Sequence, residues 1–144
     1  MKFELSNMNN IKKEITLSNE LMRRCEKKAR LMLNIVHSNE KFSNIKSEDA
    51  YLLGYISEIG KQFAKSNQSY EGIGAMYLKN NNYKYHNEVL RQNQISNIES
   101  DIGAVLKTAN LLMNRSVEET LDQYTDSKDF MKVMNLFKYT NVLN

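Results

Sequence analysis

The amino-acid sequence predicts an all-α fold, a single-domain bundle of six or seven helices. Three observations lead to this prediction. The 144 residues include no proline and only 5 glycines, so few residues would interrupt a long helix. Apolar residues recur at the spacing of one helix face in several segments. No segment keeps the alternation of apolar and polar residues that marks a half-buried strand. No internal repeat or low-complexity linker divides the chain, which favours one domain.

The overall composition limits the class of protein. With 20 basic and 17 acidic residues the net charge is +3, which gives no strong case for a nucleic-acid or membrane partner. Cys25 is the only cysteine, so no intramolecular disulfide can form and a reducing, cytoplasmic setting is expected. No apolar run approaches the roughly 20 residues that a membrane-spanning helix needs, and the N-terminus lacks the apolar region of a signal peptide.

Residues 1–17 are mostly polar and are expected to form an N-terminal lead-in, so that the helical domain covers 18–144. Ser18 is a suitable N-cap for a first long helix. Apolar residues follow it at helical spacing, namely Leu21, Cys25, Ala29, Met32, Leu33 and Val36. The opposite face is basic, with Arg23, Arg24, Lys27, Lys28 and Arg30. It can be interpreted as a nucleic-acid-binding stripe or as a solvated face. We favour the solvated face because Glu20 and Glu26 lie among the cations.

A second helix is predicted to begin after Ser47, its N-cap, and to be ended by residues 66–69, and it follows a loop over 37–44. Glu48 and Asp49 in its first turn suit the positive end of the helix dipole. Its spacing predicts a buried face made of Leu52, Leu53, Ile56, Ile59 and Phe63.

The rest of the chain continues the helical pattern. Residues 70–75 lead into a helix through Leu78, and a turn follows over 79–82. Further helices are predicted over 89–98, 102–113, 116–124 and 128–137. Ser116 and Glu119 have the spacing of a capping box, which marks the start of the third of these.

The clearest motif lies in the predicted second helix, which reads EDAYLLGYISEIGK over residues 48–61. It is similar to EDAYLAGLLHDIGK, a sequence typical of the helix that bears the paired His-Asp motif of HD-domain phosphohydrolases. Ser57 and Glu58 stand in place of the His and the Asp. Residues 25–33 are similar to the family's HSLRVAELA helix, with Cys25 at the His position. Residues 105–112 are similar to its LLxxADxL helix, with Asn110 at the Asp position.

The resemblance covers about residues 20 to 124 and implies a helical bundle with a vestigial metal site at Cys25, Ser57, Glu58 and Asn110. In the family, the divalent metal polarises a phosphoryl oxygen and lowers the pKa of a bound water. Here both imidazoles are replaced, and only Glu58 is a charged oxygen donor. We therefore expect no metal, no cofactor and no catalytic residue. Lys61 matches a lysine near the family's site, and it would either bind an anion or lie on the surface at a helix end.

The sequence leaves three functions open. The leading hypothesis is a catalytically inactive HD-domain-like protein that binds a partner protein or a small phosphorylated ligand. The first alternative is a divergent phosphohydrolase that acts on nucleotides with a divalent metal. The second is a helical interaction protein without HD ancestry. If the resemblance holds, Cys25, Ser57, Glu58 and Asn110 should converge on one cavity.

Overall fold

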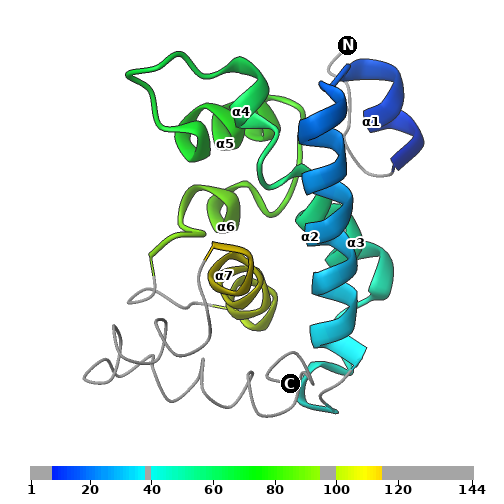
Figure 1. The fold of residues 1–144 in the computed structure, drawn as a ribbon. Coiled ribbons are helices and arrows are strands. Elements are labelled where there is room, and N and C mark those ends of the chain that lie inside the picture. The colour runs from blue at the N-terminus through cyan, green and yellow to red at the C-terminus, as the bar shows by residue number, and fades with distance from the viewer. Residues whose placement is uncertain (1–7, 38–39, 95–99, 115–144) are drawn as a thin grey trace.

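The computed structural model describes residues 8–37, 40–94 and 100–114, and within these ranges the chain is helical and contains no strand (Figure 1). The prediction of an all-α fold is therefore confirmed. The elements are α1 (Met8–Glu14), α2 (Asn19–His37), the 3-10 turn η1 (Glu40–Phe42), α3 (Ser47–Ile56), α4 (Gly60–Phe63), α5 (Tyr70–Asn80), α6 (His86–Leu90) and α7 (Asp101–Asn114). The helices predicted over 116–124 and 128–137 lie outside the described residues.

Helix α2 is the long axis of the structure, and α3 and α7 pack against it (Figure 1). Its N-terminus is capped as predicted, because the Leu21 backbone N–H donates to the Ser18 hydroxyl at 3.2 Å. The predicted apolar face is buried except for Leu33, which is half-buried. Helices α4, α5 and α6 form a second group in which α5 contacts both of its neighbours. One apolar core runs from α1 through α7.

The chain before Ser18 is not only a lead-in. Helix α1 forms there because Ile11 and Ile15 are buried in the core, and the Ile15 N–H donates to the Ile11 carbonyl at 2.9 Å. Two apolar residues one helical turn apart give this short segment a face to bury. The expectation of a polar lead-in over 1–17 is therefore wrong for Met8–Glu14.

The predicted second helix is broken into two. Helix α3 begins at Ser47 with Lys46 as its cap position, so Ser47 is not the cap, and it ends at Ile56. Residues 57–59 form a tight turn, and α4 follows from Gly60. A Cβ atom on Gly60 would lie 1.9 Å from the Tyr70 carbonyl oxygen, so α4 and α5 meet backbone to backbone. This turn brings Ser57 and Glu58 fully inside the protein.

Phe63, predicted to be buried, is 44% exposed and stacks on the Tyr77 ring with centroids 5.4 Å apart. The break after Ile56 takes it off the helical face that carries the other apolar residues. The rest of that face is buried as predicted.

Two later helices begin earlier than predicted. Helix α5 begins at Tyr70, and the Ser69 hydroxyl caps it by accepting from the Gly72 N–H at 3.0 Å. Helix α6 covers His86–Leu90, whereas the sequence predicted a helix over 89–98. Helix α7 agrees with the predicted 102–113 segment. Among the residues described, none of the helices has the length and apolar character needed to cross a membrane.

Candidate functional site

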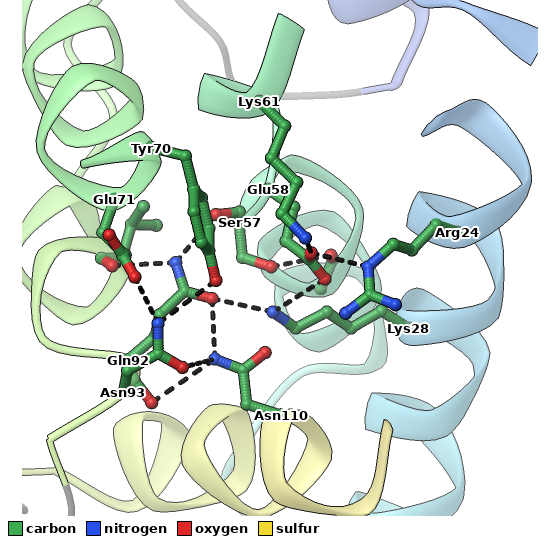
Figure 2. A network of polar contacts seen from close by, with 12 residues as sticks. Arg24, Lys28, Ser57, Glu58, Lys61, Tyr70, Glu71, Gln92, Asn93 and Asn110 are labelled. Atoms are coloured by element: carbon green, nitrogen blue, oxygen red, sulfur yellow. Dashed lines mark hydrogen bonds and ion pairs between the residues drawn. The ribbon is translucent and has the colours of Figure 1, made fainter. Parts of the chain in front are cut away.

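A single buried carboxylate, that of Glu58, is surrounded by three cationic side chains (Figure 2). Its Oε1 atom lies 2.7 Å from Arg24 Nε and 2.5 Å from Lys61 Nζ. Its Oε2 atom lies 3.4 Å from Lys28 Nζ. Arg24 and Lys28 come from successive turns of α2, and Lys61 comes from α4. The turn after α3 therefore places an acidic side chain where two helices supply cations.

The three cations determine the protonation of Glu58. Burial alone would raise the pKa of this carboxyl, but the charge of Lys28 and the hydrogen bonds from Lys61 and Arg24 lower it to about 2. Burial lowers the pKa of Lys28 to about 8, and the charge of Glu58 opposes that change. At neutral pH the carboxylate is ionised and Lys28 is protonated.

Lys28 is entirely buried and also donates a hydrogen bond to Gln92 Oε1 at 2.7 Å. The Gln92 side chain is 1% exposed, and its amide nitrogen is hydrogen-bonded as well as its amide oxygen. Its Nε2 donates to the carbonyl oxygens of Ser57 at 2.8 Å and Val89 at 2.9 Å. Gln92 thus links α2, the turn after α3 and the end of α6. The ammonium group of Lys28 occupies the interior position between Glu58 and Gln92 (Figure 2).

Asn110 of α7 extends this network. Its Nδ2 donates to Gln92 Oε1 at 2.9 Å and to Asn93 Oδ1 at 3.0 Å. Asn93 in turn donates to the Tyr70 hydroxyl at 3.1 Å and to the Glu71 carboxylate. Buried polar groups of this kind fix the packing of the helices that carry them, because each unpaired group would cost free energy.

The structure brings three of the four predicted site positions into one buried network. Glu58 and Asn110 are connected through Lys28 and Gln92, and Ser57 takes part through its backbone carbonyl. The Ser57 hydroxyl is turned away and donates to the Gly54 carbonyl at 3.0 Å. The sequence predicted that these positions converge on one cavity; here the side chains of Lys28 and Gln92 lie between Glu58 and Asn110.

Cys25, the fourth position, is fully buried. Burial, and then the charge of Glu58, raises the pKa of its thiol to about 12. The thiolate, which is the form that binds metals and attacks electrophiles, is therefore absent at neutral pH.

The divalent metal implied by the HD resemblance does not fit the residues found here. Around Glu58 the neighbours are cations, which repel a metal ion. The Ser57 hydroxyl already donates to a carbonyl, and the Cys25 thiol is protonated. Within the described residues, no three side chains of the His, Cys, Asp and Glu types lie close enough to hold a metal.

Several residues of the network escaped the sequence prediction, and two of them, Lys28 and Gln92, lie at its centre. Lys28 was assigned to a solvated basic face, and that assignment is wrong because its side chain has no exposed surface. A signal for it existed, since Lys28 follows Cys25 by three residues and precedes Met32 by four, which places it on the apolar stripe. Gln92 likewise follows the buried Val89 by three residues, but its partner Lys28 is 64 positions away and no local pattern indicates that contact.

A surface cavity of about 660 Å³ opens beside the Glu58 cluster. Lys61 was predicted to bind an anion or to lie on the surface, and its half-exposed side chain reaches both Glu58 and this cavity. Four cations and one carboxylate are among the lining residues, which are Ser18, Glu20, Leu21, Arg23, Arg24, Lys27, Lys61, Gln62 and Met113. The cavity therefore has a strongly positive wall.

No known family model matches the chain, and no curated protein or solved structure matches it either. The likeness to HD domains rests on the motifs quoted above and stays a prediction.

Proposed function

We propose that this protein is a catalytically inactive HD-domain-like protein that binds a small phosphorylated ligand in the cavity beside Glu58. The observation that carries the proposal is the excess of positive charge at that place. Arg24 and Lys61 contact Glu58 and also line the cavity, where Arg23 and Lys27 join them, and Glu20 is the one carboxylate among the described lining residues. A surface hollow with more cations than carboxylates attracts an anion, and charge-assisted hydrogen bonds hold it there.

The shape and chemistry of the cavity support a phosphate group as that anion. Arg24 and Lys61 lie at the boundary between the Glu58 cluster and the cavity, and Arg23 and Lys27 add two more cations to the wall. Arginine and lysine are the usual phosphate ligands, because both donate several charge-assisted hydrogen bonds. The volume of about 660 Å³ lies within the ~300–1,000 Å³ typical of small-molecule sites.

The alternative of a divergent metal-dependent nucleotide phosphohydrolase receives less support. Such an enzyme needs a metal to polarise the phosphoryl oxygen and to generate hydroxide. Lys28 occupies the interior position beside Glu58, and its ammonium group neither lowers the pKa of a water as a metal does nor leaves room for one. The second alternative is a helical interaction protein without HD ancestry. It differs from our proposal because it predicts no phosphate binding beside Glu58. A cytoplasmic location is part of the proposal, because the single cysteine suits a reducing compartment.

The absence of metal chemistry is tested by elemental analysis of the purified protein and by phosphate release from a nucleotide panel with Mn²⁺, Ni²⁺, Fe²⁺ or Zn²⁺. The proposal expects no stoichiometric metal and no release above the rate of a blank. A stoichiometric metal that is lost in Glu58→Ala, or hydrolysis that depends on Glu58, would establish the alternative.

Phosphate binding is tested by calorimetric titration with inorganic phosphate and pyrophosphate. Lys61→Gln removes one charge-assisted contact and should weaken pyrophosphate binding by about tenfold. Lys65→Gln is a matched control, because Lys65 is an exposed lysine nearby in sequence that does not line the cavity. Equal affinities of the two variants, or no binding to the unmodified protein, would count against the assigned pocket.

A further inference from the structure

The outer face of α2 carries a second hollow that continues the cavity at Lys61. It has a volume of about 420 Å³ and is lined by Arg23, Glu26, Lys27, Arg30, Leu31 and Asn34. Arg23 and Lys27 line both hollows, so the two lie next to each other along the helix. We call the pair of hollows, from Ser18 to Asn34, the α2 groove. At a rise of ~1.5 Å per residue it is about 24 Å long.

The cations of the groove are available to a partner. Arg23, Lys27 and Arg30 are exposed, and in the part of the chain that the structure describes no carboxylate lies within ion-pair distance of them. This differs from Arg24 and Lys61, which are bound to Glu58. A row of three exposed cations that have no carboxylate partner among the described residues raises the local concentration of negatively charged molecules.

The spacing of the first two of these cations is close to the repeat of an extended polypeptide. Arg23, Lys27 and Arg30 follow one another along α2 at intervals of about 6 Å and about 4.5 Å. In an extended chain, alternate side chains point the same way and repeat every ~6.6–6.8 Å. Acidic residues at every second position of an extended segment would therefore meet Arg23 and Lys27, and the next acidic residue would lie about 2 Å beyond Arg30, within the reach of a long arginine side chain. A groove of about 24 Å accommodates seven residues of such a segment.

We propose that the α2 groove is a docking site for an acidic, extended segment of a partner protein. Charge complementarity commits the proposal to an acidic occupant, and the rest of the lining favours a peptide over a nucleic acid. Among the described residues no aromatic side chain lines either hollow, so none of them would stack a base. Glu20 and Glu26 can accept hydrogen bonds from the N–H groups of a peptide backbone, which a phosphate backbone lacks. Leu31 and Met113 offer apolar contact to the residues between the acidic ones.

The test is fluorescence anisotropy with a labelled seven-residue peptide in which Glu alternates with Val and Thr. A second peptide of the same composition has its Glu residues in one block, and a single-stranded oligonucleotide of equal charge is the third probe. We expect the alternating peptide to bind most tightly, and its affinity to fall as salt rises above about 0.1 M. Lys27→Glu should weaken it by about tenfold or more, and Lys79→Glu, an exposed α5 lysine outside the groove, should not.

Arg30→Glu separates this proposal from the proposed phosphate site. Arg30 lines only the second hollow, so its reversal should weaken the peptide and leave the pyrophosphate titration unchanged. The docking proposal is overturned if the two peptides bind equally, if Lys27→Glu behaves as Lys79→Glu does, or if no peptide binds. Tighter binding of the oligonucleotide than of the alternating peptide would identify the groove as a nucleic-acid site instead. If the alternating peptide binds and pyrophosphate does not, the result would contradict the proposed phosphate site and support the peptide-docking site.

Discussion

The substitution Glu58→Gln tests the arrangement of charges at the centre of the protein. It retains the size of the side chain and removes its charge. Lys28 then has no counter-charge, since Glu58 is the only carboxylate within ion-pair distance of it among the described residues. Arg24 and Lys61 lose the same partner, but they are partly exposed and can turn to water.

The size of the effect follows from the pKa of Glu58. Its fall from 4.5 to about 2 on folding corresponds to ~3 kcal/mol of stabilisation when the group is ionised. Removing one member of a buried ion pair costs about 3–5 kcal/mol in other proteins, which agrees with this value. We therefore expect Glu58→Gln to lower the free energy of unfolding by ~3 kcal/mol at neutral pH.

The measurement is urea unfolding followed by circular dichroism over a range of pH. The pKa of Glu58 is lower in the folded state than in the unfolded state, so its contribution is complete above about pH 4.5 and is lost as the pH falls toward 2. The difference in the free energy of unfolding between the wild-type protein and Glu58→Gln should therefore fall toward zero over that pH interval. A gap below about 1 kcal/mol at neutral pH, or one that is independent of pH, would refute the reasoning.

Lys28→Met is the matched comparison, because it removes the other member of the pair. Burial lowers the pKa of Lys28 to about 8, which means that keeping this ammonium charged is costly. Glu58 retains Arg24 and Lys61 in the variant. We expect Lys28→Met to change the free energy of unfolding by less than about 1 kcal/mol or to raise it. If Lys28→Met lowers the free energy of unfolding more than Glu58→Gln does, the result would show that Glu58 depends on Lys28 more than Lys28 depends on Glu58.

Three further predictions concern packing and reactivity. Gln92→Leu should lower the free energy of unfolding by about 2 kcal/mol or more in the same urea assay, because several buried hydrogen bonds lose their partner, and a near-neutral result would contradict the network. Gly60→Ala should lower it by about 1–3 kcal/mol, since the added Cβ meets the Tyr70 carbonyl, whereas Gly72→Ala has space and should raise it by about 0.5–1 kcal/mol. Cys25 should react with a thiol reagent only in denaturant, and rapid labelling of the native protein would show that its burial is wrong.

The local rules of helix formation accounted for much of the fold. The Ser18 cap, the apolar face of α2 and the extent of α7 follow from short-range patterns that need no knowledge of distant residues. The break after Ile56 was not predicted; it lies just before Gly60, whose backbone packs closely against the Tyr70 carbonyl of the next helix, and no local pattern indicates that contact. A glycine within an apolar run is compatible with both a continuous and a broken helix until its neighbour is known.

The sequence motifs indicated only some of the residues that form the buried network around Glu58. The motif comparison selected Glu58 and Asn110, and both belong to the buried network. It did not select Lys28, because a lysine among four other cations suggests a solvated face. Complete burial and the lowered pKa that burial causes are properties of the tertiary environment, and the residue that accepts the hydrogen bond of Lys28, Gln92, lies 64 positions away.

The most direct test of the central claim is a calorimetric titration of pyrophosphate into the protein with EDTA present. The account holds that side-chain cations, and no metal, attract the phosphorylated ligand to the cavity beside Glu58. It predicts binding in EDTA that weakens by about tenfold in Lys61→Gln and is unchanged in Lys65→Gln. Binding that disappears in EDTA and returns with Mn²⁺ would contradict it.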